Sequence, residues 1–269
     1  MVRLPAVAGL FYSNQAEELF QQVESLCAPL ACEMRRRAIA CMVPHAGYRY
    51  SGHVAGAVYA RLEMPRRFLL IGPRHYPRGE AQAILSEGAW QTPLGRVMID
   101  TEMAAELKRA WGSLVEDDVA HRSDHALEVQ LPFLQCLVGE FRFVPIALGP
   151  VDFAVLESLG KAIAQVVARQ TEPVLIVVSS DMNHFEPDEI TRIKDGLALE
   201  QLLALDARGL HDTVRRESIS MCGYGPAVSM LIAARLLGAT RAELVRYATS
   251  GDVSGDRDEV VGYAGVIVE

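Results

Sequence analysis

The stretch that decides the fold is Val43-Pro44-His45-Ala46-Gly47-Tyr48-Arg49-Tyr50-Ser51-Gly52. An apolar run over residues 38–43 leads into it and has the length of a buried strand. Pro44 and His45 end that run, and the chain then turns through Gly47. A histidine at the end of a buried strand points into the crevice beyond the sheet, where open α/β sheets bind their ligands. The stretch therefore predicts an α/β fold with a polar site at the carboxyl ends of its strands.

The same pattern occurs twice more along the chain. Residues 68–73 and 174–180 are further apolar runs, and polar side chains follow each of them closely. The groups that follow the three runs are imidazoles and a carboxylate: His45, His75, Asp181 and His184. Because parallel strands point their carboxyl ends the same way, we expect these four side chains to converge on one crevice.

The remaining patterns alternate between helix and strand. Helices are expected at 16–26, 53–62, 101–111, from 125 onward, 152–169, 188–206 and 226–237. Asn14 and Asp124 are the expected caps of the first and fourth of these helices. Further strands are expected at 141–148, 243–249 and 260–268, with a hairpin-like excursion over 81–99. The alternation predicts a three-layer α/β/α single domain over residues 1–269, with a central mixed, partly parallel sheet.

Composition excludes several classes of partner. The chain has 269 residues, of which half are hydrophobic, so it can bury a full core without disulfides. Its formal net charge of -8 argues against nucleic acid or an anionic membrane as the main partner, since both select basic surfaces. No apolar run approaches the roughly 20 residues that cross a bilayer.

The cysteines predict a reducing compartment. Their number is odd and no two have C-x-x-C spacing: Cys27, Cys32, Cys41, Cys136 and Cys222. The chain also begins without the pattern of a signal peptide, so we expect a cytoplasmic protein with free thiols. Cys222 lies just before a predicted helix, where the helix dipole favours a thiolate. Taken alone, Cys222 is more typical of a small buried apolar residue than of a ligand.

These polar groups have the chemistry of a metal site. Two imidazoles with one thiolate or carboxylate hold a divalent metal with open positions, which favours Fe(II), Cu or Zn. A single histidine at a strand end is commonly only a hydrogen-bonded structural residue, but His45 and His75 share the same strand-and-proline context. Ser179 and Ser180 are expected to bond the backbone, because no G-x-S-x-G motif surrounds them.

Seven segments together resemble the Memo family, which includes the bacterial and archaeal proteins called protein B of the AmmeMemoRadiSam system. They occur in the same order over the whole chain, as 8–12, 43–52, 72–75, 124–132, 179–184, 222–223 and 250–264. The family is similar in fold to the class III extradiol ring-cleaving dioxygenases, which hold Fe(II) with two histidines and a carboxylate. In the Memo family a cysteine stands in place of that carboxylate.

The resemblance implies a role for each residue of the crevice. His45, His75 and Cys222 would be the metal ligands, and Fe(II) would be the metal, with Cu or Zn as alternatives. Asp181 and His184 would lie beside the metal, and His184 would match the acid–base histidine of the dioxygenases. Asn183 departs from the family pattern, which often has Ser or Cys at that position.

Several functions are compatible with this site. The first is an iron-dependent, dioxygenase-like redox enzyme that activates O2. The alternatives are a non-catalytic metal- or peptide-binding protein, a metallohydrolase, and a partner of a radical S-adenosylmethionine enzyme and of AMMECR-type proteins. In each enzymatic or binding case a small molecule or peptide would enter the pocket. We expect Tyr48, His125 and Glu128 to contact it, although the last two also suit a capped helix start.

Overall fold

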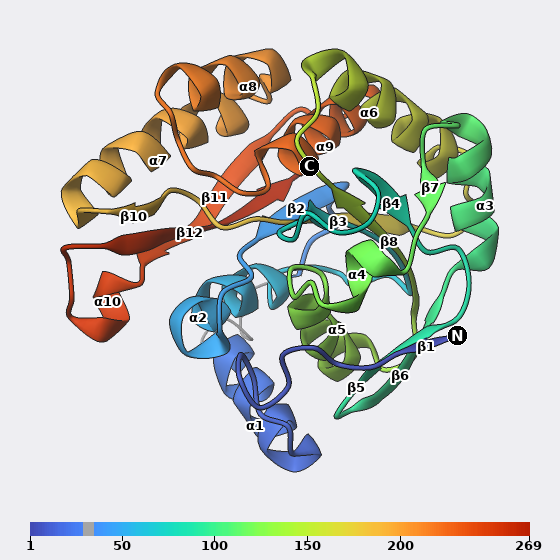
Figure 1. Cartoon of the computed structure of the whole chain (residues 1–269), viewed down its shortest axis with the longest axis horizontal. Coiled ribbons are helices and arrows are strands. Elements are labelled where there is room, and N and C mark those ends of the chain that lie inside the picture. Colours follow the sequence, from blue (N-terminus) through green and yellow to red (C-terminus); the bar gives the residue numbers. More distant parts are fainter. Residues whose placement is uncertain (29–34) are drawn as a thin grey trace.

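The structure is a computed structural model that describes residues 1–28 and 35–269, so Cys32 lies outside the described residues. A mixed sheet forms its middle layer (Figure 1). The strands are β1 (Val2–Arg3), β2 (Ala40–Val43), β3 (Arg67–Pro73), β4 (Gln82–Ile84), β5 (Ala89–Thr92), β6 (Gly95–Ile99), β7 (Val115–Glu116), β8 (Arg142–Leu148), β9 (Val174–Ser179), β10 (His184–Glu186), β11 (Ala242–Thr249) and β12 (Val260–Val268). The helices are α1 (Ala16–Cys27), α2 (Tyr48–Tyr59), α3 (Thr101–Ala110), α4 (Val119–Arg122), α5 (Leu131–Val138), α6 (Phe153–Val167), α7 (Asp188–Leu203), α8 (Ala207–Arg216), α9 (Tyr224–Leu236) and α10 (Gly251–Ser254).

The centre of the sheet is parallel and its margins are mixed. The strand order is β1-β5-β6-β8-β3-β9-β2-β12-β10, and β8, β3, β9 and β2 all run the same way. β12 joins β2 in the antiparallel sense and also pairs with β11. The carboxyl ends of β3, β9 and β2 therefore lie side by side at one edge of the sheet. The alternating α/β fold with a mixed sheet is confirmed.

Helices cover both faces because the central strands are apolar on both sides. Leu69 and Ile71 of β3 pack on the face covered by α3, α6, α7, α8 and α9. Phe68 and Leu70 of the same strand pack on the opposite face, against α1, α2 and α5. Full burial of each such side chain contributes about 1.5 to 3 kcal/mol, so these alternating residues fix the three layers. Figure 1 shows the two helical layers on either side of the sheet.

Three predicted element boundaries near the crevice were wrong. The helix expected at 53–62 already begins at Tyr48, because Gly47 is its N-cap and the Tyr48 amide donates to the Phe11 carbonyl. The helix expected from His125 begins only with a 3-10 turn at Glu128–Gln130 and continues as α5. Asp124 is not its cap; its carboxylate instead accepts the amide of Ala126 two residues on, which forms a local turn.

Other differences between the predicted and the observed elements arise from strand pairing and from turns between helices. Within 81–99 only β5 and β6 form a hairpin, because β4 pairs with β8 and β7. The helix expected at 188–206 ends at Leu203, since Leu205 has a positive φ of 56° and Asp206 caps the next helix, α8. Asn14 does not cap α1, whose N-cap residue is Gln15. Among the described residues, no helix is both long and apolar enough to span a membrane.

Candidate metal centre

His45 follows β2 and its ring is held in one orientation. Its Nδ1 lies 3.0 Å from the hydroxyl of Ser179, which itself donates to the carbonyl of Ala126 at 2.5 Å. Because the single hydroxyl proton of Ser179 is used in that way, the serine accepts the Nδ1 proton of His45. The Nε2 atom of His45 is then the nitrogen with a free lone pair, and this is the form that binds a metal.

His75 follows β3 and is oriented in the same manner by a carboxylate. Its Nδ1 lies 3.1 Å from Oδ1 of Asp124, and its amide donates to Oδ2 of Asp124 at 2.7 Å. Burial raises the pKa of Asp124, but the hydrogen bonds from His75 and Ala126 outweigh it and leave that pKa lowered. An ionised Asp124 fixes the Nδ1 proton of His75, so its Nε2 also carries a free lone pair.

His45, His75 and His125 form a group that could hold a metal ion, called the histidine group below. Each offers one ring nitrogen, and these three atoms lie within 4.8 Å of one another. The rings of His75 and His125 stack at 4.6 Å, and the His45 ring meets both edge-on at 5.1 and 5.4 Å. Three imidazoles at this spacing are typical ligands for Zn, Cu or Fe.

The electrostatics keep the imidazoles of His45 and His125 neutral. Burial lowers the pKa of His45 well below its usual range, and the neighbouring His75, His125 and His184 lower it further. Burial and then His75 lower the pKa of His125 to about 4. At neutral pH these rings therefore hold no competing proton, which favours metal binding.

Cys222 lies against His45 at the start of α9. Its Sγ is 3.3 Å from Nε2 of His45 and accepts the amide of Asp181 at 3.3 Å. The thiolate expected from the sequence is disfavoured in the absence of a metal, because burial and then the carboxylate of Asp181 raise the pKa of the Cys222 thiol. Nevertheless, a sulfur and a nitrogen that share one tetrahedral metal lie about 3.5 Å apart, so the observed separation suits a common ion.

Asp181 and His184 are brought to the same edge of the sheet. Oδ1 of Asp181 accepts the backbone amide of His45 at 2.7 Å, and burial raises the pKa of Asp181 to about 7. Nδ1 of His184 donates to the carbonyl of Ser220 at 3.0 Å, which leaves Nε2 free. Burial lowers the pKa of His184.

The other two residues expected at the pocket are held within the protein. Tyr48 is 2% exposed and its hydroxyl donates to the carbonyl of Val129 at 2.5 Å. Glu128 is fully buried and accepts hydrogen bonds from Arg3 and from the hydroxyl of Tyr12, both at 2.6 Å. Their contacts tie the amino-terminal segment and α2 to the turn at Glu128–Gln130. A contact between either side chain and a substrate stays a prediction.

Comparison with known proteins identifies the family. The model of the "Memo-like protein" family matches residues 3–267. The chain belongs to the Memo family. It is 42% identical over 271 residues to a MEMO1 family protein of Methanosarcina barkeri, with all of both chains covered. It is 40% identical over 276 residues to a MEMO1 family protein of Pyrobaculum aerophilum, covering 99% of this chain and 98% of that one.

A solved structure shows the same fold. An uncharacterized protein from Escherichia coli K12 superposes with a TM-score of 0.55 over 86% of this chain and 100% of that chain. The two sequences are only 13% identical, so the likeness concerns the fold alone.

Three residues of this Memo-family crevice were missed as orienting groups. Asp124 was interpreted as a helix cap, yet it holds His75. Ser179 was expected to bond backbone, which it does, but it also holds His45. Gln130 donates to the carbonyl of Pro44 and to Ser179, both at 2.9 Å, and so links the ends of β2 and β9. No local pattern marks these contacts, because their partners lie 49 to 134 residues away along the chain.

Proposed function

We propose that this crevice binds a divalent metal, Fe(II) in the first place with Cu or Zn as alternatives, and that the protein is a dioxygenase-like redox enzyme. The ligands in this proposal are His45, His75 and Cys222, with His125 beside them. The observation that carries it is the fixed Nδ1 atom of both His45 and His75. Each ring thereby presents a lone pair on Nε2 toward the other ligands. A histidine with a purely structural role does not require this orientation.

The donor set fits such an ion. Two imidazoles and a sulfur are ligands that bind iron, copper and zinc, whereas Mg²⁺ and Ca²⁺ prefer oxygen. Cys222 must lose its proton on binding, so metal affinity should rise with pH. A bound Fe(II) would supply Lewis acidity and a binding position for O2 and substrate.

The chain itself supplies proton transfer and orientation. His184, anchored through Nδ1 to the Ser220 carbonyl, keeps Nε2 available to take a proton from a substrate hydroxyl. Asp181 holds the backbone of His45 and, with a pKa near 7, can exchange a proton near neutrality. The stacked ring of His125 forms an aromatic wall beside His75, suited to a flat substrate.

A second candidate is a metal-holding protein without chemistry. The buried thiol of Cys222 beside His45 favours it, because a thiolate ligand alters the iron and is itself open to oxidation. This candidate requires tight Cu(I) or Fe(II) affinity that is lost in Cys222→Ser. Full metal occupancy in Cys222→Ser would instead remove Cys222 from the ligand set.

Elemental analysis of protein purified without added metal tests the site. We expect iron or copper in the wild type and its loss in His45→Ala, with His53→Ala as a matched control because His53 lies on α2 outside the histidine group. Equal metal content in all three proteins would refute the site. Anaerobic loading with Fe(II), followed by catechols and O2, tests the chemistry; no O2 uptake with iron still bound would refute the enzyme and leave the metal-holding candidate.

A further inference from the structure

His184, the acid–base residue of the proposed function, lies on a short and irregular strand. β10 pairs with β12 through His184 and Glu186, and the register shifts between these two residues. Phe185, which lies between them, has a positive φ of 58° and is 71% exposed. A bulky residue rarely adopts this backbone conformation, which persists only where surrounding contacts hold it. The position of His184 therefore depends on contacts outside the strand pairing.

Asn183, the residue before β10, supplies such contacts with a fully buried side chain. Its Oδ1 accepts the amide and the hydroxyl of Ser220, each at 3.1 Å. Its Nδ2 donates to Oε2 of Glu186 at 2.6 Å and to the hydroxyl of Thr191 at 3.3 Å. The side chain thus joins the loop before α9 to the far end of β10. An amide suits this position, because one end of the group faces donors and the other end faces a carboxylate.

Ser220 in turn holds both the backbone and the ring of His184. The hydroxyl of Ser220 donates its proton to Asn183 and accepts the His184 amide at 2.7 Å. The carbonyl of Ser220 accepts Nδ1 of His184 at 3.0 Å. Because a carbonyl can only accept, this bond places the imidazole proton on Nδ1 and leaves the lone pair on Nε2. With the proton on Nε2 instead, the ring could not take up another proton at that atom.

We propose that Asn183 is a positioning residue for His184, and that it acts through Ser220 to fix the tautomer and the direction of the imidazole. The inference rests on the proposed function, because a free Nε2 matters only if His184 takes a proton from a substrate. Asn183 is fully buried, so its effect on the reaction passes through its partners. A residue that only stabilised the fold would leave the tautomer of His184 unchanged when it is substituted.

Nitrogen NMR of the metal-free protein tests this without any requirement for activity. Two-bond ¹H–¹⁵N correlation spectra at pH 8 distinguish a protonated ring nitrogen from one with a lone pair, and His184→Gln identifies the signals of His184. Burial lowers the pKa of His184, so the ring is neutral at this pH. We expect the proton on Nδ1 in the wild type. A proton on Nε2 would overturn the proposal.

Substitution of Asn183 should redistribute this proton. In Asn183→Ala, Ser220 loses its fixed partner, so the two nitrogen signals of His184 should shift toward each other, as in a mixture of tautomers. Ser220→Ala, which removes only the hydroxyl, should give a smaller shift in the same direction. Asn183→Asp keeps an acceptor for Ser220 but places a charge beside Glu186, so it should lower the melting temperature and keep the proton on Nδ1.

Ser229→Ala is the matched control, because Ser229 is a buried serine that donates to the carbonyl of Leu156 at 3.0 Å, between α6 and α9. It should leave the signals of His184 unchanged, and thermal melting checks that each variant folds. Unchanged signals in folded Asn183→Ala and Ser220→Ala would overturn the proposal, as would loss of the Nδ1 proton in Asn183→Asp. Because neither metal nor turnover is needed, this result is separate from the metal content and O2 uptake that test the proposed function.

Discussion

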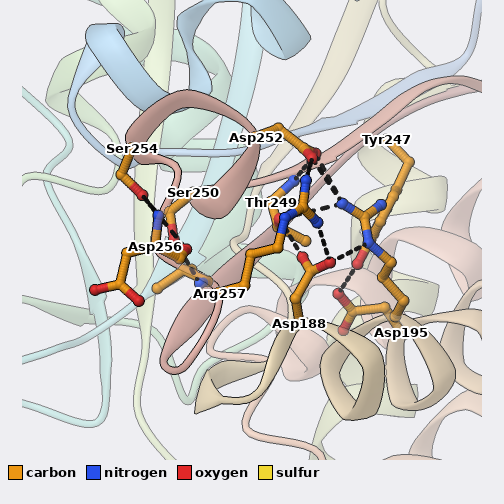
Figure 2. Close-up of polar contacts among 11 residues, drawn as sticks. Asp188, Asp195, Tyr247, Thr249, Ser250, Asp252, Ser254, Asp256 and Arg257 are labelled. Carbon is orange, nitrogen blue, oxygen red and sulfur yellow. Dashed lines mark hydrogen bonds and ion pairs between the residues drawn. The ribbon is translucent and has the colours of Figure 1, made fainter.

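Two polar clusters of this protein differ in how their charges are compensated. In the arginine–aspartate network, formed by Asp188, Arg192, Asp252 and Arg257, every carboxylate meets two guanidiniums (Figure 2). The pair distances are 2.5 Å for Asp188–Arg257, 2.9 Å for Asp188–Arg192 and Arg192–Asp252, and 3.2 Å for Asp252–Arg257. In the histidine group, burial and then the neighbouring imidazoles lower the pKa of His45 and of His125.

The difference is the one expected between a structural cluster and the proposed metal-binding cluster. The network connects α7 to α10 and to the end of β11, and its partners satisfy one another without a ligand. In the histidine group, three ring nitrogens lie within 4.8 Å of one another and could hold a metal ion. A polar cluster whose members satisfy one another is expected to stabilise the fold, whereas a cluster of buried lone pairs with lowered pKa values is a candidate site.

The largest effect on the free energy of unfolding is expected from substitution of Asp188, the residue at the centre of the network. Asp188 is 8% exposed and accepts from Arg192, Arg257 and, at 2.6 Å, the hydroxyl of Thr249. Asp188→Ala should lower the free energy of unfolding by about 3 kcal/mol, because it removes two ion pairs and the acceptor of the buried Thr249 hydroxyl, and leaves Asp252 alone to compensate both guanidiniums. For a chain of this size that is about 6 to 12 °C in Tm. Thermal and chemical denaturation measure the loss.

If the network and the histidine group are independent, Asp188→Ala should leave metal affinity unchanged at a temperature where the variant is folded. A parallel loss of metal affinity would show that the network and the histidine group are coupled.

The second effect belongs to the histidine group. Asp124→Asn keeps the shape of the side chain but removes the ionised acceptor of the His75 Nδ1 proton. Loss of such an orienting carboxylate typically lowers metal affinity about 10- to 100-fold. Competitive titration with a chelator measures it. The matched control is Asp118→Asn, since Asp118 pairs with the exposed Arg122 at 2.5 Å, away from the histidine group. Equal losses in both variants would contradict the prediction.

The sequence predicted the central strands and their polar ends because these signals are local. The apolar runs before His45, His75 and Asp181 identify buried strands directly, and the parallel sense brings their ends together. The family resemblance then supplied Cys222, which lies 177 residues from His45.

The partners of these residues could not be predicted in the same way. Asp124 was interpreted as a helix cap and Ser179 as a strand end. Their contacts with His75 and His45 depend on which strands become neighbours, so no local pattern predicts them. The start of α2 at Tyr48 depends on a tertiary bond to Phe11.

Asp195, a carboxylate beside the network, is expected to make the free energy of unfolding depend on pH. Asp195 is fully buried, and burial raises its pKa to about 7 although the Tyr247 hydroxyl and the Asn183 amide lower it (Figure 2). Between the ordinary value of 3.8 and about 7, the folded chain binds a proton that the unfolded chain does not. The free energy of unfolding should therefore fall as pH rises through this window.

Asp195→Asn should remove this dependence, because an amide does not titrate and still accepts the Asn183 amide. Between pH 5 and pH 8, the free energy of unfolding of the variant should rise by about 1 to 2 kcal/mol relative to that of the wild type. Urea denaturation at both pH values measures it. A constant difference would mean that Asp195 is ionised throughout.

The smallest effect is expected at the exposed end of the network. The side chain of Arg257 is 55% exposed, although it pairs with both Asp188 and Asp252. Exposed pairs contribute little because solvent screens them and the side chain loses conformational freedom, so Arg257→Ala should cost about 1 kcal/mol or less. Most of that cost should disappear in high salt.

A double-mutant cycle with Asp252→Ala isolates the exposed pair. Arg192 remains in all four proteins and continues to pair with Asp188, so the coupling energy should be only a few tenths of a kcal/mol. A coupling above about 2 kcal/mol would mean that the network acts as one buried unit. In that case the four charged side chains would behave as one buried unit, although the side chain of Arg257 is exposed. The network would then differ from the histidine group more strongly than the exposed fraction of Arg257 indicates.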